Sequence, residues 1–395
     1  MTDLSAPEFP ISRDNPFDPP AELGRRREED PLSRMTYPDG HVGWLVTSYD
    51  TARAVLADAR FSSRGELKRA PLAQGNTAEQ TQPAPPGFFV SNDPPEHTRY
   101  RHLLTGQFTV RRMRELTSRI EEITAHQLDF LAERGPGADL VQDFGLPIPS
   151  LVICELLGVP YADREDFQRH SAELVRVGNS PEDRIAAYLG LRDYMQELVL
   201  DKRAAPQEDV LSGLTGSDLT DEELANIGFM LLGAGHDTTA NMLALGTFAL
   251  LHQPDQLDLL KTGSVGVAQV VEELLRYLSI VPFTVRTALT DIELNGHLVK
   301  AGESVTVSIQ AANRDPRRFD RPDVLDLHRT ATGQMAFGHG IHQCLGQQLA
   351  RIEMQVAFPA LFNRFPTLRL DIAFEDVPLR SDMLIYGVHR LPVTW

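Results

Sequence analysis

Apolar residues recur at three- and four-residue spacing along much of the chain, which predicts amphipathic helices. Two such stripes are formed by Met113, Leu116, Ile120 and Ile123 and by Val271, Leu274, Leu275 and Leu278. The most apolar stretch, residues 227–251, carries charged and polar residues at its centre. A charged group there would strongly destabilise a lipid-spanning helix. We therefore predict that helix outweighs strand and that residues 227–251 form a buried helix.

Strand signals are shorter and fewer. The patterns at residues 43–47 and 305–309 suit short strands. Asn295-Gly296 lies between two apolar pairs and predicts a hairpin over residues 292–299, because both positions accept a positive φ. Residues 70–95 contain several prolines and little periodicity, which predicts a long surface loop.

Composition limits the class of protein. The chain has 395 residues, of which 42% are hydrophobic, so it can bury a large core. A formal net charge of −17 argues against a surface that binds nucleic acid or anionic lipid throughout. The N-terminus lacks a basic segment followed by an apolar core, so we expect neither a signal peptide nor a membrane anchor. Low cysteine usage fits a reducing compartment, and we expect a cytoplasmic monomer.

The two cysteines lie in different contexts. Cys154 is part of an apolar helical stretch and is expected to be a buried core residue. Cys344 lies in FGHGIHQCLG, residues 337–346, whose glycines permit a tight turn and the close approach of a flat ligand. Residues 347–358 have the apolar spacing of a helix, so the helix N-terminus would favour the Cys344 thiolate, which could ligate a metal. Two alternatives remain for this cysteine: a buried hydrophobe, or a nucleophile with His339 or His342 as its base.

Polar residues interrupt the apolar helix at residues 234–239, AGHDTT. Glycine inside a helix costs about 1 kcal/mol relative to alanine. A buried Asp237 needs a partner or water. Thr238 could donate a hydrogen bond to a carbonyl one turn back, and Asp237 could open a water-filled groove. The alternative is a kink with a satisfied polar cluster, and His236 could perturb the groove or face away.

Two pairs of polar residues lie at helical spacing. Glu273 and Arg276 are three residues apart, which by itself predicts a surface ion pair. His97 and Arg101 are four apart and share a helical face, as a two-point grip on an anion requires. A solvated basic turn is the alternative for the second pair.

Taken together, these motifs resemble those of the cytochrome P-450 family, in the family's order and over nearly the whole chain. The loop around Cys344 resembles the haem-binding loop, and residues 234–238 resemble the oxygen-binding groove. The resemblance implies a mainly α fold with small β sheets, as a single α-rich globule over residues 1–395. Its β-rich part would come from residues 36–60, 290–312 and 380–395, approximately.

The resemblance also implies roles for individual residues. Cys344 would bind the iron of haem b, and Asp237 and Thr238 would deliver protons to bound dioxygen. Glu273 and Arg276 would form a buried network with Arg329 or, alternatively, His328. Further haem contacts are implied for Phe337, Gly338, Gly346, Ala234 and Gly235, and propionate contacts for His97, Arg101, Arg286 and His342.

The implied activity is that of a monooxygenase, which inserts one atom of O2 into a bulky lipophilic substrate by hydroxylation or epoxidation, as in secondary-metabolite tailoring. Electrons would come from a ferredoxin and its separate NAD(P)H reductase, because the chain shows no flavin motif. The implied pocket wall includes Phe88, Val90, Val177, Leu232, Ile280, Val281, Phe283, Val285 and Ile385. The alternatives are a peroxygenase or isomerase of this fold, a Cys–His acyl transferase, and a non-enzymatic haem carrier or sensor.

A basic segment interrupts the acidic sequence between His97 and Arg114. It has no acidic residue and contains Arg99, Arg101, Arg111, Arg112 and Arg114. Because complementary charge steers association, we predict that this segment docks an acidic ferredoxin. A solvated helix is the alternative.

Overall fold

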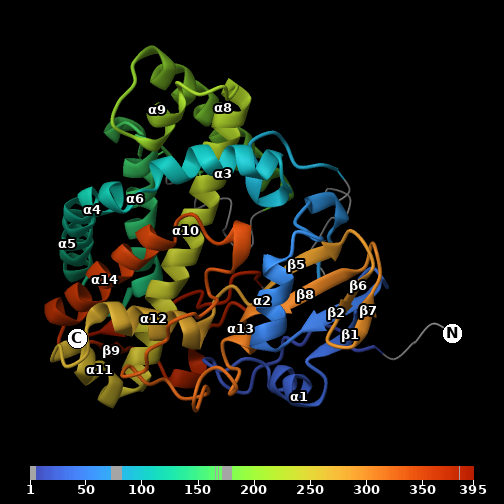
Figure 1. Ribbon diagram of the computed structural model, residues 1–395. Coiled ribbons are helices and arrows are strands. Elements are labelled where there is room, and N and C mark those ends of the chain that lie inside the picture. The colour runs from blue at the N-terminus through green and yellow to red at the C-terminus, as the bar shows by residue number, and fades with distance from the viewer. Residues whose placement is uncertain (1–5, 73–81, 165, 168, 171–179, 382) are drawn as a thin grey trace.

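Helices dominate the computed structural model, which describes residues 6–72, 82–164, 166–167, 169–170, 180–381 and 383–395 (Figure 1). The helices are α1 (Ala21–Glu29), α2 (Tyr49–Ala57), α3 (Glu96–Gln107), α4 (Val110–Glu115), α5 (Thr117–Arg134), α6 (Pro147–Leu157), α8 (Pro181–Ala204), α9 (Val210–Leu214), α10 (Asp221–His252), α11 (Pro254–Lys261), α12 (Val267–Leu278), α13 (Ile309–Ala312) and α14 (Gln347–Arg364). The predicted buried helix lies within α10, and the predominance of helix is confirmed. The first apolar stripe is divided between α4 and α5 at Leu116, yet Met113 and Ile120 on either side are both buried.

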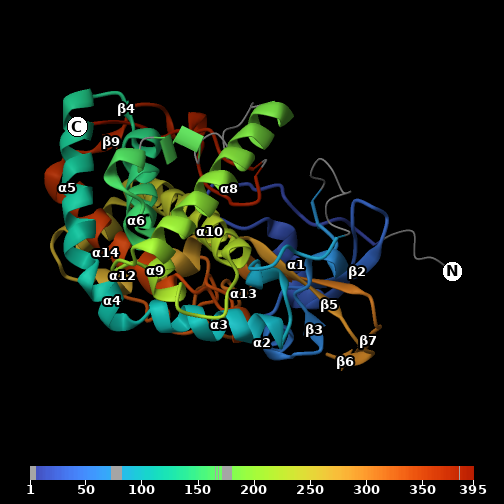
Figure 2. The same cartoon turned by 90° about the horizontal axis from the view of Figure 1, so that it is seen from above.

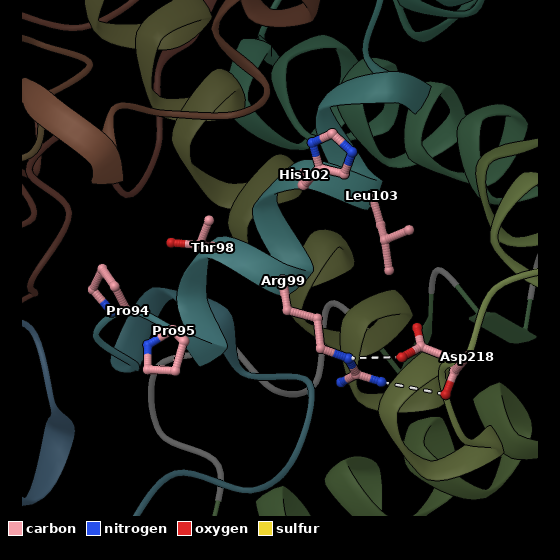
Figure 3. Close-up of a pocket in the computed structure, with 7 residues that line it drawn as sticks. All are labelled: Pro94, Pro95, Thr98, Arg99, His102, Leu103 and Asp218. Carbon is pink, nitrogen blue, oxygen red and sulfur yellow. Dashed lines mark hydrogen bonds and ion pairs between the residues drawn. The ribbon is translucent and has the colours of Figure 1, made fainter.

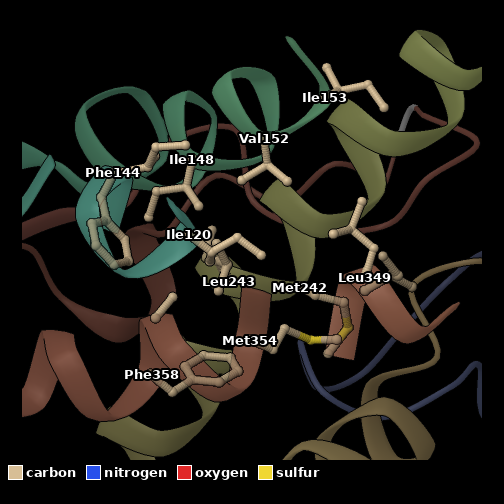
Figure 4. Packing of buried hydrophobic residues seen from close by; sticks show 14 of the residues in the cluster. Ile120, Phe144, Ile148, Val152, Ile153, Met242, Leu243, Leu349, Met354 and Phe358 are labelled. Atoms are coloured by element: carbon tan, nitrogen blue, oxygen red, sulfur yellow. The ribbon is translucent and has the colours of Figure 1, made fainter. Parts of the chain in front are cut away.

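The core is centred on α10, which Figures 1 and 4 show between α6 and α14. Met242 and Leu243 of α10 belong to the same buried cluster as residues of α6 and α14. The two helices pack tightly at Gly246, where an added Cβ would lie 2.6 Å from the ring of Phe358 on α14. The absence of a side chain at this position thus sets how tightly α14, which follows the Cys344 loop, packs on the central helix.

A five-stranded sheet lies beside the helices, in the order β1-β2-β8-β5-β3 (Figure 1). Its strands are β1 (Leu32–Thr36), β2 (Val42–Val46), β3 (Phe61–Ser62), β5 (Phe283–Ala288) and β8 (Ser304–Ser308). The two predicted strands are confirmed as β2 and β8, and they pair in parallel. The predicted hairpin is also confirmed: β6 (Ile292–Leu294) pairs with β7 (His297–Val299) across Asn295 and Gly296, which both have a positive φ.

The C-terminal strand lies elsewhere than expected. We predicted that residues 380–395 join the β-rich part with residues 36–60, but β10 (Pro392–Thr394) pairs with β4 (Ala138–Asp139) and β9 (Arg369–Leu370) in a separate sheet. Val393 is fully buried in the same cluster as the helical core. Burial of this apolar side chain among the helices explains why the chain end lies there.

Two expectations concern the surface. The described parts of the proline-rich stretch, residues 70–72 and 82–95, contain turns and only a short 3-10 helix, Phe89–Ser91, in agreement with the predicted loop. Residues 73–81 lie outside the described residues. In the part of the chain that the structure describes, every helix is too short or too polar to cross a membrane.

The start of α10 is joined to α3 by one carboxylate. Thr220 and Glu223 form a reciprocal capping box at the N-terminus of α10. Glu223 also accepts hydrogen bonds from the Arg99 guanidinium and the Tyr100 hydroxyl, each at 2.6 Å. Burial alone would raise the pKa of Glu223, but the hydrogen bonds from Arg99, Tyr100 and Thr220 outweigh it and lower the pKa to about 2.

Glu223→Gln should destabilise the protein at neutral pH by about 3 kcal/mol, the linkage equivalent of this shift. A lowered carboxyl pKa contributes stability above the unfolded-state value of 4.5, and this contribution is lost as the pH falls from 4.5 toward 2. The difference in unfolding free energy between wild type and variant should therefore shrink over that range. Urea unfolding at several pH values measures it, with Glu121→Gln on the exposed face of α5 as control. A difference that stays constant with pH would contradict the prediction.

Candidate functional site

The loop before α14 is folded so that Cys344 is held by its backbone. The Cys344 amide donates to the Phe337 carbonyl at 2.9 Å, which closes the loop. Gly338 and Gly340 both have a positive φ. A Cβ at Gly340 would collide with the Leu56 carbonyl, whereas a Cβ at Gly338 or Gly346 would meet no atom within 4 Å. The loop therefore needs glycine for its turn and leaves open space beside Gly338 and Gly346.

The two cysteines differ in exposure as the sequence suggests. Cys154 is fully buried in α6, whereas the Cys344 side chain is accessible. Desolvation by the surrounding protein raises the pKa of the Cys344 thiol, although the Gly346 amide and the Arg101 and Arg351 guanidinium groups act in the opposite direction. The predicted preference for thiolate at the helix N-terminus is thus outweighed by desolvation in the protein alone, and a cation at the sulfur would be needed to restore it.

His342 is poorly suited to act as a base for Cys344. Its ring lies 4.1 Å, centroid to centroid, from the ring of His97. Desolvation and the neighbouring positive groups, led by His97 and Arg286, lower the pKa of His342 to about 3. A nucleophilic Cys–His pair needs a base that accepts a proton near neutral pH, so this geometry disfavours the His342 version of that alternative.

Basic side chains gather beside the loop from three separate segments. His97 comes from α3, Arg286 from β5 and His342 from the loop itself. Both ring nitrogens of His97 are buried without a hydrogen-bond partner. Desolvation lowers the pKa of Arg286 to about 10, and among the described residues the charge of Asp93 acts in the opposite direction. Buried positive groups and unpartnered donors in one place indicate a site for an anion.

Lys68 also belongs to this cluster, and sequence reasoning missed it. Desolvation, followed by the charge of Arg286, lowers the pKa of Lys68 to about 8, and Lys68 in turn lowers the pKa of His342. The Thr287 hydroxyl holds the adjacent Leu67 carbonyl against β5. Lys68 lies in an irregular segment without periodicity, so no local signal distinguishes it from a surface lysine.

Arg101 shares the α3 face of His97 but points to the loop carbonyls, where its Nη2 donates to Gln343 at 2.7 Å. Arg101 forms no ion pair with a described carboxylate, and its charge interacts with Cys344. The cluster and the open glycines fit a flat, dianionic group such as haem, with the two acids at the basic side chains and the metal at Cys344. No set of three or more His, Cys, Asp or Glu side chains among the described residues could hold a metal ion, so such an ion would need further ligands from its own cofactor.

The middle of α10 is accessible on one side only. Gly233 and Ala234 are exposed and Thr238 is half-buried, while the helix around them is in the core. The Thr238 hydroxyl donates to the Ala234 carbonyl at 2.9 Å, one turn back, as the sequence predicts. His236 is buried and thus faces away from this side. The exposed strip lets a ligand approach the helix backbone at Gly233 and Ala234.

Gly235 is half-buried, and the position of its missing side chain faces α6 rather than the accessible strip. An added Cβ would lie 3.2 Å from Ile153 of α6. Its missing side chain therefore serves helix packing between α10 and α6, and Gly233, one turn from Asp237, is the glycine on the accessible side.

Asp237 is buried and paired. Arg380 donates from Nη1 to Oδ1 at 2.7 Å and from Nη2 to Oδ2 at 3.1 Å. Asn241 donates from Nδ2 to the Asp237 backbone carbonyl at 2.7 Å and to Oδ1 at 3.1 Å. Sequence reasoning expected water at this carboxylate and missed Arg380, because the two residues come from distant segments with no shared pattern.

Glu273 and Arg276 are completely buried and joined by two hydrogen bonds of 2.7 and 2.8 Å. Arg329 donates from Nε to Glu273 at 3.1 Å, whereas His328 is exposed. Arg276 also donates to the Asn313 and Pro322 carbonyls. The network links α12 to the segment that leads into the Cys344 loop, which makes it a scaffold.

The predicted pocket residues fall into different surroundings. Phe88 and Val281 are half-buried, as is Ile385, and Val90 is exposed. Ile280 is buried, and its carbonyl accepts a hydrogen bond from the Tyr386 amide, which brings two of the predicted wall segments together. Val177 lies outside the described residues.

Three predicted pocket residues point away from the site: Leu232 does not lie on the accessible strip of α10, and Phe283 and Val285 do not lie on the Arg286 face of β5. Leu232 is buried in the core. Phe283 and Val285 alternate with Arg286 on β5, so they point to the opposite face of the sheet. There Phe283 packs against Phe9, with ring centroids 4.9 Å apart. Thr284, whose hydroxyl accepts from Arg286, is the β5 residue that shares the Arg286 face.

A surface groove of about 670 Å³ runs along α3, lined by Pro94, Pro95, Thr98, Arg99, His102, Leu103 and Asp218 (Figure 3). Helical spacing puts the lining residues that belong to α3, which are Thr98, Arg99, His102 and Leu103, on the opposite side of that helix from His97 and Arg101. The groove is therefore separate from the site around Cys344. Figure 3 shows Arg99 reaching Asp218, which it meets at 3.2 Å.

Comparisons with known proteins find relatives and solved structures that match nearly the whole chain. A family model described as Cytochrome P450 matches residues 267–378. The chain is 49% identical over 398 residues to Cytochrome P450 105C1 of a Streptomyces species, covering 100% of both chains. It is 41% identical over 397 residues to Vitamin D3 dihydroxylase of Streptomyces griseolus, covering 99% of this chain and 97% of that protein. The solved structure of Streptomyces peucetius CYP105P2 in complex with a biphenyl compound matches with a TM-score of 0.93 and 42% identity, over 99% of this chain and 100% of that one.

Glu273→Gln should destabilise the protein by about 3–5 kcal/mol, because it leaves Arg276 and Arg329 buried without their carboxylate. Glu115→Gln, which breaks the exposed pair with Arg111, is the control and should cost less than about 1 kcal/mol. Denaturant unfolding measures both. If Glu273→Gln does not accumulate, Arg329→Met keeps the Glu273–Arg276 pair and should give a smaller but measurable loss. Equal losses for the Glu273 and Glu115 variants would show that the network is not a scaffold.

Proposed function

Because the chain belongs to the cytochrome P450 family, whose members are haem-thiolate monooxygenases that use O2, we propose that Cys344 is the protein ligand of the haem iron. The observation that carries this proposal is the accessible Cys344 thiol in a glycine-lined loop, next to a desolvated basic cluster in which the two ring nitrogens of His97 have no hydrogen-bond partner. A cationic iron at the sulfur would offset the desolvation that raises the pKa of the thiol.

Each part of the site has a separate task in this proposal. His97, Arg286 and His342 bind the haem carboxylates, with Lys68 as a further cation beside them. Arg101 and Arg351 add positive charge near the sulfur. Phe337 and Gly346 frame the thiolate side, and Ala234 frames the opposite side. Haem bound there supplies the redox chemistry, in which two electrons and two protons allow one atom of O2 to enter the substrate while the other leaves as water.

Proton handling is assigned to Asp237 and Thr238. The Thr238 hydroxyl lies at the accessible strip of α10 and donates its proton to the Ala234 carbonyl, so its oxygen remains free to accept a hydrogen bond. In this position it would orient a proton donor toward a ligand in the site. Asp237 is one residue away and is the acidic group closest in sequence to that hydroxyl. A carboxylate and an alcohol next to each other suit stepwise proton transfer from solvent.

The proposed substrate is a bulky lipophilic molecule, modified in the tailoring of a secondary metabolite. The half-buried apolar residues Phe88, Val281 and Ile385 support an apolar pocket with few polar anchors. Similar proteins are named for vitamin D3 and solved with a biphenyl compound, and both ligands are apolar. Hydroxylation and epoxidation are the two outcomes that this chemistry allows.

A ferredoxin is the proposed electron donor, served by a separate NAD(P)H-dependent reductase, in a cytoplasmic monomer. The basic segment supports a docking face that is smaller than the sequence suggested. Arg99 pairs with Asp218 and Glu223, and Arg111 pairs with Glu115. Arg112 and Arg114 of α4 remain as the positive groups, because Arg112 donates to the neutral Gln107 and Arg114 is exposed.

Cys344→Ser tests the iron ligand. Thiolate ligation moves the main absorption band of the reduced carbon monoxide complex far to the red, so this band should be lost in Cys344→Ser. Cys154→Ser is the matched control, because Cys154 is buried in α6, and it should keep the band. A red-shifted band that persists in Cys344→Ser would refute the assignment.

Charge reversal of Arg112 and Arg114 to Glu tests the docking face. The second-order rate of reduction by an acidic ferredoxin should fall by about tenfold or more at low salt, and its dependence on salt should flatten. Reversal of Arg192 on α8, whose side chain is 42% exposed, and of the exposed Arg369 on β9 is the control for net charge. Stopped-flow reduction measures the rate, and unchanged kinetics would contradict this docking face.

A further inference from the structure

A short C-terminal hairpin reaches the catalytic part of α10. Leu379 and Val388 form its antiparallel bridge. The His389 amide donates to the Pro378 carbonyl at 2.8 Å, and the Arg380 amide donates to the Gly387 carbonyl at 2.9 Å. These bonds join residues 378–381 to residues 383–389, and we call these described residues the clamp hairpin.

Two residues of the clamp hairpin are fitted against α10. Arg380 holds both carboxylate oxygens of Asp237. Gly387 lies so close to Asn241 that an added Cβ would collide with its Oδ1. Asn241 itself donates to the Asp237 carboxylate. The hairpin thus determines the position of Asp237 directly through Arg380 and indirectly through Asn241.

The same hairpin carries part of the predicted pocket wall. The Tyr386 amide donates to the Ile280 carbonyl, and the adjacent Ile385 is half-buried. Leu384 is 44% exposed, although it is a large apolar residue and the following residues Tyr386 and Val388 are buried. A ligand in the pocket would press on this side of the hairpin, six residues or fewer from Arg380.

The pairing is costly to maintain, which argues that it has a task. Arg380 is 8% and Asp237 9% exposed, and Arg380 Nε is buried without a hydrogen-bond partner. A buried ion pair with an unsatisfied donor adds little stability compared with an apolar pair of the same size. It does fix geometry, because a guanidinium that bonds both oxygens leaves the carboxylate one orientation.

We propose that Arg380 is the positioning residue of Asp237, and that the clamp hairpin couples occupancy of the pocket to the freedom of this carboxylate to move a proton. The proposal rests on the proton role of Asp237 given above. With Arg380 in place, both oxygens of Asp237 are held away from solvent. Movement of the hairpin releases one oxygen, which then reaches solvent protons and the neighbouring Thr238.

Oxidase turnover without substrate tests the positioning role. Reduction of O2 then ends either as hydrogen peroxide, with two electrons and two protons, or as two water molecules, with four of each. Poor proton delivery favours peroxide. We expect Asp237→Asn to raise the peroxide formed per NADPH by about threefold or more. Arg380→Met leaves the Asp237 carboxylate free to reach solvent, so it should lower the peroxide yield below that of wild type, and the double variant should match Asp237→Asn.

Conservative and matched variants separate positioning from general damage. Arg380→Lys keeps one charged hydrogen bond, so its peroxide yield should lie between those of wild type and Arg380→Met. Lys202→Met breaks another buried pair, which joins Lys202 of α8 to Asp209 at the N-cap of α9 at 2.7 Å. Neither residue belongs to the clamp hairpin or to α10. This substitution should destabilise the holoenzyme without changing the peroxide yield. The assay uses the haem-bound protein with a plant-type ferredoxin and its reductase.

Hydrogen exchange gives a readout that does not depend on turnover. The Arg380 and Tyr386 amides are bonded within or next to the clamp hairpin. If the pair holds the hairpin, Asp237→Asn should speed exchange of both amides in the holoenzyme by about tenfold, as a reciprocal coupling requires. Lys202→Met should leave them unchanged.

The outcomes distinguish the two proposals. An unchanged peroxide yield in Asp237→Asn contradicts the proton role of Asp237. A raised yield in Asp237→Asn with a wild-type yield in Arg380→Met overturns the positioning role of Arg380 alone. Unchanged amide exchange in Asp237→Asn overturns the coupling to the hairpin.

Discussion

The site depends on one electrostatic constraint: positive groups are brought together and desolvated where few carboxylates offset them. α3, β5 and the Cys344 loop each contribute a basic side chain, and Lys68 adds another from an irregular segment. The protein alone bears the repulsion between these groups. Binding of a dianionic cofactor would convert it into attraction, so that cofactor affinity and folding stability are linked. The fold is thus completed by the ligand that it is shaped to bind.

The central helix meets the opposite requirement, because it must carry polar groups through an apolar core. It does so by giving each group a separate solution. Thr238 bonds to the preceding turn, Asp237 pairs with Arg380, and His236 is buried away from the accessible strip. Glu223 caps the start of the helix and ties it to α3. The same helix that organises the core therefore presents backbone and hydroxyl to a ligand at one short strip.

Local patterns were sufficient to predict much of the fold and part of the site. The hairpin at Asn295-Gly296, the buried course of α10 and the helix after Cys344 follow from periodicity and turn chemistry. Contacts between distant segments did not follow. Arg380 and Lys68 lie in irregular stretches, which carry no periodic signal. The pairing of β10 with β4 and β9 depends on the burial of Val393 among the helices, which the local sequence does not show. Phe283 and Val285 were misplaced because the alternation of β5, with Arg286 on one face, was not applied to its neighbours.

The N-terminal segment supports the clamp hairpin from outside. The Tyr386 hydroxyl donates to the Pro16 carbonyl, and the Arg13 guanidinium lies 3.8 Å above the Tyr386 ring. Arg13 also bonds to Gln310, beside β8, so the brace reaches back to the sheet. Residues near the beginning of the chain consequently support a hairpin that lies hundreds of positions later in the sequence. Trimming or fusing that end would therefore disturb the hairpin and, with it, the pocket wall proposed above. Exchange of N-terminal segments between relatives is then a route to altered selectivity that leaves every proposed reactive side chain in place.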